Sequence, residues 1–228
     1  RLSPTQKFRL KIISNECEMK DFIQNINNIK IDTFQASEII PGPSNLLFTY
    51  GSYYDYGEPL GEFVGRKITQ FPKKFGVVCI AENKYNKAVR DIGRRLLKEI
   101  EFKGISQVEL KYDIRDKKFK LMEINPRSWM WIKLPTECGV NLPLIQYINM
   151  INNECTYKKL SQDGKPKLFI DLPSVIIKAL NADLFDLKYT LKNLQNAVFS
   201  TFSIDDLTPG PMFLVQKLKN SLKDFKIR

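Results

Sequence analysis

The feature that most constrains the fold is a pair of segments, residues 105–112 and 118–125, that flank a short charged turn. In each segment side chains of different character alternate, a period of two that is typical of β-strands. The turn at 113–117 is short enough to join them as an antiparallel hairpin. Pro126 ends the second strand, because proline cannot donate a hydrogen bond to a sheet ladder. The chain must therefore build a sheet around this hairpin.

The rest of the chain alternates helical and extended patterns. The clearest helix is predicted at 83–100, where an apolar stripe faces a row of lysine and arginine residues. Further helices are predicted at 16–26, 141–152, 172–179 and 213–225, further strands at 8–13, 33–40, 46–53 and 60–68, a loop at 73–79, and breaks at 41–43 and 208–211. The pattern predicts an α+β fold, with a mostly antiparallel sheet and flanking helices.

Composition narrows the classes of function. Histidine is absent, which excludes catalytic triads with histidine and histidine-ligated metals within this chain. The four cysteines show no C-x-x-C spacing, and scattered single cysteines suit a reducing, cytoplasmic compartment. No stretch approaches the roughly 20 apolar residues of a membrane helix, so no membrane span is expected.

The net charge of +11 admits three kinds of partner: nucleic acid, an anionic membrane surface or a polyphosphate ligand. Because the basic residues are spread along the chain without a concentrated stripe, a solvated basic surface accounts for most of them. Nucleic acid is therefore not the expected partner, although a non-catalytic polyanion-binding module stays open as an alternative.

The predicted hairpin brings acidic side chains together. If the hairpin turns about Asp116, Glu109 lies opposite Glu123, and Asn125 shares the face of Glu123. Like charges directly opposite each other destabilise a sheet unless a cation lies between them. Two carboxylates and an amide oxygen form an oxygen-only ligand set, which suits Mg²⁺ or Mn²⁺. The alternative is a pair of surface glutamates on an exposed hairpin.

Arg127 follows this set by two residues, where its guanidinium can hold a phosphate or a carboxylate. Glu109 on one strand and the run Glu123-Ile124-Asn125-Pro126-Arg127 on the next resemble the metal motif of the ATP-grasp superfamily, of the kind found in carboxylate–amine ligases, biotin carboxylase and carbamoyl-phosphate synthase. The resemblance implies that Glu109, Glu123 and Asn125 bind the magnesium ions of ATP. It also implies that Arg127 steadies an acyl phosphate or the substrate carboxylate.

A further segment, residues 35–42, resembles the family's hinge strand. The resemblance implies that Ser37, Glu38, Ile39 and Ile40 bind the nucleotide. The Ser37 carbonyl and the Ile40 amide would face the adenine. Taken alone, this segment also reads as an edge strand ended by Pro-Gly.

Arg66 and Lys67 lie on a strand that should neighbour the hairpin and point to opposite faces, so at most one faces the site squarely. Similar strands of the family present a basic residue to the phosphates or the acyl intermediate, and Arg66 is slightly favoured over Lys67 for this role. Trp129 and Trp131 directly follow the metal motif, where they could line an acceptor pocket, although core packing is the expected use of at least one of them.

The resemblance covers residues 5–152, and it sets the expected organisation. Residues 1–40 would hold the remainder of a first ATP-grasp lobe and the hinge, residues 41–154 the second lobe with the metal site, and residues 155–228 a small C-terminal extension. The first lobe is expected to be incomplete, with its phosphate-binding lysine before Arg1, so that this chain alone would be an incomplete enzyme.

The function implied by the resemblance is that of an ATP- and Mg-dependent ligase. Such an enzyme forms an acyl phosphate from a small-molecule carboxylate and couples it to an amine, and a homo-oligomer is compatible with it. A bicarbonate-activating enzyme of the carboxylase or carbamoyl-phosphate type is the alternative within the family.

Overall fold

The computed structural model describes residues 11–26, 35–73, 75–152, 166–202, 206 and 208–226. The chain divides into two compact units, Arg1–Ile39 and Ile40–Arg228. Within the first unit, α1 spans Glu16–Ile26, as predicted, and the side chain of Asn15 accepts a hydrogen bond from the Glu18 amide at 2.9 Å. This bond satisfies one of the free amides at the start of the helix.

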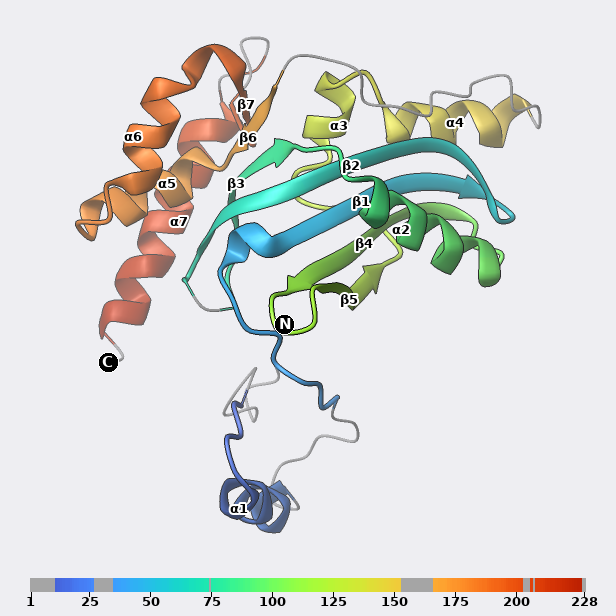
Figure 1. The fold of residues 1–228 in the computed structure, drawn as a ribbon. Helices are drawn as coiled ribbons and strands as arrows, with labels where there is room; N and C mark the ends of the chain where they lie inside the picture. The colour runs from blue at the N-terminus through green and yellow to red at the C-terminus, as the bar shows by residue number, and fades with distance from the viewer. Residues whose placement is uncertain are drawn as a thin grey trace. The chain divides into compact units, whose positions relative to one another are not determined.

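The second unit is built on one sheet, shown in Figure 1. In the described residues this sheet has seven strands in the order β5-β4-β1-β2-β3-β6-β7. The strands are β1 (Leu47–Asp55), β2 (Glu58–Phe71), β3 (Val77–Asn83), β4 (Gly104–Asp113), β5 (Lys118–Asn125), β6 (Leu168–Ile170) and β7 (Ala197–Phe199). Neighbouring strands are antiparallel except β6 and β7, which run parallel, so the predicted mostly antiparallel α+β fold is confirmed.

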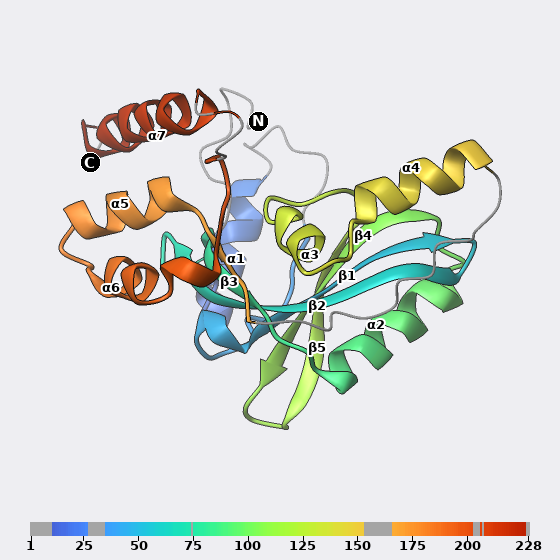
Figure 2. The same cartoon turned by 90° about the horizontal axis from the view of Figure 1, so that it is seen from above.

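Helices cover both faces of the sheet. They are α2 (Lys87–Glu99), α3 (Lys133–Glu137), α4 (Leu142–Asn152), α5 (Leu172–Leu180), α6 (Phe185–Lys192) and α7 (Pro209–Lys226), with short 3₁₀ turns η1 (Ser44–Leu46) and η2 (Leu194–Asn196). Figure 1 shows α5, α6 and α7 gathered near β6 and β7, and Figure 2 shows α2 and α4 along β1 and β2. No helix of the described chain is long and apolar enough to cross a membrane.

The alternation of each central strand divides the core into two layers. Tyr50 and Val64 point toward α2, and they pack there with Val89 and Leu97. The residues one step along, such as Tyr53 and Phe63, belong to the other layer, beneath α3 and α4. Because side chains alternate between the two faces of the sheet, the same alternation decides which polar side chains share a face with Glu109.

Several predictions of single elements were wrong. Residues 35–40 form no strand, and the expected loop at 73–79 ends early because β3 begins at Val77. The expected break at 208–211 is instead the start of α7, where prolines at the first turn cost no helical hydrogen bond.

The segment expected to form a C-terminal extension supplies β6 and β7 to the same sheet. The expected boundary after Glu154 lies outside the described residues, and the division into 1–40, 41–154 and 155–228 stays a prediction.

Candidate metal and nucleotide site

The pairing of β4 with β5 brings the predicted residues opposite each other, although the turn pairs Asp113 with Lys118 and so is not centred on Asp116 as expected. Glu109 lies opposite Glu123, and Gln107 lies opposite Asn125. The register shifts by one residue directly after Glu109, so a bulge adjoins the acidic pair, a common feature beside functional sites. On its other side Glu109 pairs with Thr49 of β1. The two carboxylates therefore share a face of the sheet.

A network of amides connects the acidic side chains. The Asn125 amide donates to Glu123 Oε1 at 2.7 Å. The Gln107 amide donates to Glu109 Oε1 at 3.0 Å and to Thr49 Oγ1 at 3.3 Å. These bonds engage the Oε1 atom of each carboxylate.

Gln107 is a site residue that the sequence analysis missed. It is buried, and its position two residues before Glu109 was the available signal, because alternate residues of a strand share a face.

Glu109 is in an environment that disfavours its charge. Burial raises the pKa of its carboxyl above the usual range, and the nearby Glu123 carboxylate raises it further, while Lys67 and Arg127 act to lower it. A carboxyl whose charge is penalised in this way is stabilised by any cation that reaches it. This observation on Glu109 fits a metal ligand better than an unconstrained surface glutamate.

Arg127 lies at the end of this network. Its guanidinium donates to Asn125 Oδ1 at 3.3 Å and to the Ser128 carbonyl at 3.1 Å, and the side chain is exposed. Its backbone amide donates to the Asn125 carbonyl at 2.9 Å, which turns the chain sharply after β5. The exposed guanidinium can therefore bind an anion beside the two carboxylates.

Arg66 and Lys67 point to opposite faces, as expected, but Lys67 is the one on the side of Glu109. Lys67 is buried, and its charge lowers the pKa of the Glu109 carboxyl. The Arg66 guanidinium instead binds Glu82, with its Nε 2.8 Å from Glu82 Oε1, and lies over the Phe48 ring on the α2 face. The geometry favours Lys67, not Arg66, as the cation of this site.

Lys111 is a second residue that the sequence analysis missed. Its ammonium donates to the Ile40 carbonyl at 2.7 Å and to the Gly42 carbonyl at 2.9 Å. Lys111 lies two residues beyond Glu109 on β4, so it fixes the end of the expected hinge to the strand that carries a candidate metal ligand. Burial and the neighbouring charge of Lys67 lower the pKa of Lys111.

The expected nucleotide-binding residues fall on both sides of the unit boundary. Ser37, Glu38 and Ile39 belong to the first unit and are exposed, whereas Ile40 begins the second unit and is buried. Their role in binding adenine stays a prediction.

The two tryptophans after the metal motif are core residues. Trp129 is 5% exposed and Trp131 is 2% exposed, and their rings meet edge to face at 6.1 Å. The expected core packing is confirmed for both. The indole of Trp129 lies against Gly51, where an added Cβ would come within 2.3 Å of the ring. This contact fixes the segment after β5 onto the sheet, close to Asn125 and Arg127.

The donor set fits an oxygen-binding cation. No group of three or more histidine, cysteine, aspartate or glutamate side chains in the described ranges is arranged to hold a metal ion. The candidate site has instead two carboxylates, of Glu109 and Glu123, and the amide of Asn125. Such a set suits Mg²⁺ or Mn²⁺, whose remaining positions are typically filled by water and phosphate oxygens.

Comparison with known proteins identifies the relatives of this chain. No family model matches it. D-aspartate ligase of Enterococcus faecium (strain Aus0004) is 27% identical over 148 residues, which is 62% of this chain and 35% of that enzyme. The chain resembles the ATP-grasp ligases. It spans about a third of the length of this ligase.

Solved structures of ATP-grasp proteins are also similar. A complex of biotin carboxylase with β,γ-ATP from Campylobacter jejuni is 15% identical, with 57% of this chain and 30% of that chain covered and a TM-score of 0.43. The urea carboxylase of Kluyveromyces lactis is 17% identical, with 54% and 11% covered and a TM-score of 0.44. Since both TM-scores are under 0.5, these similarities are partial, and the site residues are assigned from the geometry of this chain.

Proposed function

We propose that the protein is an ATP- and Mg-dependent ligase that converts a small-molecule carboxylate into an acyl phosphate and couples it to an amine. The observation that supports this most directly is the pairing of Glu109 with Glu123, beside Asn125 and Arg127, on the edge of the sheet. The similarity to D-aspartate ligase, whose name describes a ligase reaction, supports the same class.

Each residue of the site has a distinct task in this reaction. Glu109, Glu123 and the Asn125 amide oxygen would hold Mg²⁺, which supplies charge neutralisation for the phosphates of ATP. Arg127 would bind the oxygens of the acyl phosphate or of the substrate carboxylate. Lys67, which lies on the same face as Glu109, would add a fixed positive charge for the transferred phosphoryl group. No covalent protein nucleophile is required, which agrees with a chain that has no histidine.

The hinge segment would supply the adenine-binding part of the nucleotide site. We assign the adenine contacts to the backbone of Ser37 and Ile40, with Glu38 and Ile39 beside them. The bond from Lys111 to the Ile40 carbonyl supports this assignment, because it joins the end of the hinge to β4. A cytoplasmic location is supported by cysteines Cys17, Cys79 and Cys138, which are free.

The test is ADP release by the full-length protein, measured with a panel of amino acids and other carboxylic acids in the presence and absence of Mg²⁺. Glu123→Gln removes one carboxylate at nearly constant volume and should abolish Mg-dependent ADP release. Glu99→Gln, on the exposed end of α2, is the matched control and should leave it unchanged. Turnover of Glu123→Gln near that of wild type would exclude the metal assignment.

The same assay separates the alternatives. ADP formation that needs bicarbonate and no organic acid would assign the protein to the bicarbonate-activating enzymes. Binding of polyanions without ADP release, with an affinity that falls steeply as salt rises, would support a non-catalytic module.

A further inference from the structure

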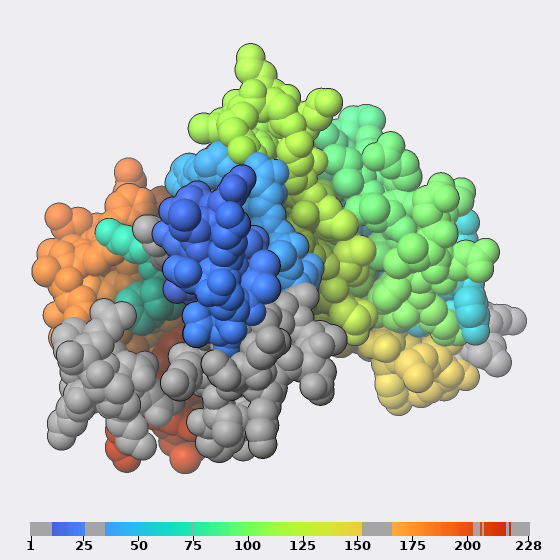
Figure 3. Space-filling model, turned by 90° about the horizontal axis from the view of Figure 1, so that it is seen from below, coloured from blue at the N-terminus to red at the C-terminus, as the bar shows by residue number. Residues whose placement is uncertain are grey.

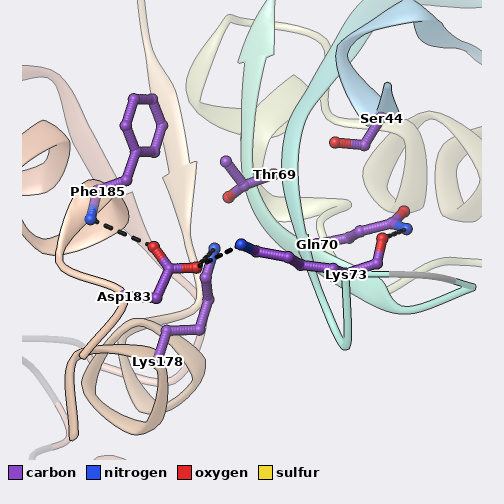
Figure 4. Close-up of a pocket in the computed structure, with 7 residues that line it drawn as sticks. All are labelled: Ser44, Thr69, Gln70, Lys73, Lys178, Asp183 and Phe185. Carbon is purple, nitrogen blue, oxygen red and sulfur yellow. Dashed lines mark hydrogen bonds and ion pairs between the residues drawn. The ribbon is translucent and has the colours of Figure 1, made fainter. Parts of the chain in front are cut away.

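A polar pocket, whose lining includes neither Glu109 nor Glu123, lies between the end of β2 and the turn that joins α5 to α6. Its volume is about 230 Å³, and Figure 4 shows the side chains around it. The lining residues are Ser44, Thr69, Gln70, Lys73, Lys178, Asp183 and Phe185. Pockets for drug-sized ligands measure about 300–1,000 Å³, so this one suits a smaller molecule.

Charges of both signs meet at the pocket. The Asp183 carboxylate lies 3.6 Å from the Lys178 ammonium and 3.8 Å from the Lys73 ammonium, which approach it from different elements (Figure 4). Lys178 is buried and donates at 2.6 Å to the buried Asp186, which also accepts from Thr69 at 2.9 Å. Lys178 is thus neutralised by Asp186, and its pairing leaves Lys73 and Asp183 as the adaptable charges.

Lys73 is the group best able to bind a ligand. Its side chain is 84% exposed, and its separation of 3.8 Å from Asp183 is too long for a hydrogen bond. The Gln70 side-chain amide donates to the Lys73 carbonyl at 2.7 Å, which holds the backbone of Lys73 beside the end of β2. An exposed ammonium that lies beside a carboxylate without a hydrogen bond to it can turn to a ligand carboxylate, while Asp183 binds a ligand ammonium.

We infer that this pocket binds a small zwitterion of the α-amino acid class. The ligand carboxylate would bind Lys73, its ammonium would bind Asp183, and a short side chain would lie against Phe185. A simple anion fits less well, because Asp183 would repel it. This inference does not depend on the proposed ligase reaction, and its test contains no nucleotide.

The test uses NMR titration of the isotopically labelled chain with alanine, in both enantiomers, and with two half-ligands. Propionate presents only the carboxylate and isopropylamine only the ammonium. Alanine should shift the backbone amide signals of Thr69, Gln70 and Asp183 in a saturable way, and each half-ligand should bind about tenfold more weakly because it engages one charge.

Variants locate the effect. Lys73→Gln and Asp183→Asn should each weaken alanine binding by about tenfold. Lys84→Gln and Glu99→Gln, both exposed and outside the pocket, should bind as wild type does. The inference is overturned if wild type shows no saturable shifts with either enantiomer up to about 20 mM. Propionate binding as tightly as alanine would overturn it in favour of a plain anion site. Because the half-ligand comparison uses wild type, it stands even if a variant fails to fold.

Discussion

The acidic pair predicts that a substitution can stabilise the ion-free protein while removing its response to the ion. Glu109→Gln keeps the shape of the side chain and its bond from Gln107, but it removes the charge. Since the pKa of the Glu109 carboxyl is raised in the fold, folding penalises the charged form of this side chain. Like charges opposite each other cost about 0.2–1 kcal/mol, so without Mg²⁺ the variant should be more stable by about that amount.

The sign of the pH dependence follows from the same shift. A raised pKa means that the folded chain holds the Glu109 proton more tightly than the unfolded chain. The stability contributed by this group is therefore present below its usual pKa of 4.5 and is lost as the pH rises toward the folded-state pKa. The advantage of Glu109→Gln should thus be largest at neutral pH and should vanish in acid.

The assay is thermal unfolding in EDTA and in Mg²⁺ with ADP. In EDTA the midpoint should rise by about 0.5–4 °C in the variant, since 1 kcal/mol corresponds to about 2–4 °C for a chain of this size. At ten times its dissociation constant, a ligand should stabilise wild type by about 1.4 kcal/mol, and the variant should lose most of this gain. Glu99→Gln, exposed on α2, is the control for a lost surface charge. If Glu109→Gln is destabilised in EDTA, or gains as much from Mg²⁺ and ADP as wild type, the reasoning is wrong.

Two further predictions concern the support of the sheet, and a third concerns the burial of a thiol. Arg94→Met should lower the free energy of unfolding by about 2–3 kcal/mol in a denaturant titration, because it leaves the buried Glu62 carboxylate without its guanidinium. An unchanged unfolding midpoint would show that the pair is dispensable. Asn86→Ala should cost about 1 kcal/mol in the same titration, because the Asn86 side chain caps α2. A thiol reagent at pH 8 should modify the exposed Cys17 quickly and leave Cys79 unmodified in the folded protein, because burial raises the pKa of the Cys79 thiol to about 12. Equal rates of modification would contradict the burial of Cys79.

The sequence predicted the acidic site well because its geometry is local. A short turn fixes the register of a hairpin near the turn, and the one-residue shift after Glu109 then places this residue opposite Glu123 instead of Met122, which the spacing alone does not give. The face of Gln107 follows from the same period, and only its bonding partners needed the structure. The helix α2 was equally accessible, because its apolar stripe continues over several turns.

What could not be predicted depends on contacts between distant parts of the chain. Lys111 reaches the Ile40 carbonyl across 71 positions of sequence, and no local pattern indicates such a bond. The strands β6 and β7 have three residues each, too few for a period of two to be visible. The segment at 35–40 has the composition of a strand but forms none, since extended residues need a partner strand to complete their hydrogen bonds.

The position of β5 has a consequence for solubility. It is the terminal strand of the sheet in the described part of the chain, so its outer row of backbone groups has no neighbouring strand, and Figure 3 shows the β4–β5 hairpin (yellow-green) at the molecular surface. Exposed strand edges invite aggregation unless charged side chains guard them. Lys118, Lys120 and Glu123 lie on this strand, so the carboxylate assigned to ion binding also helps to keep one molecule from adding its sheet to that of another.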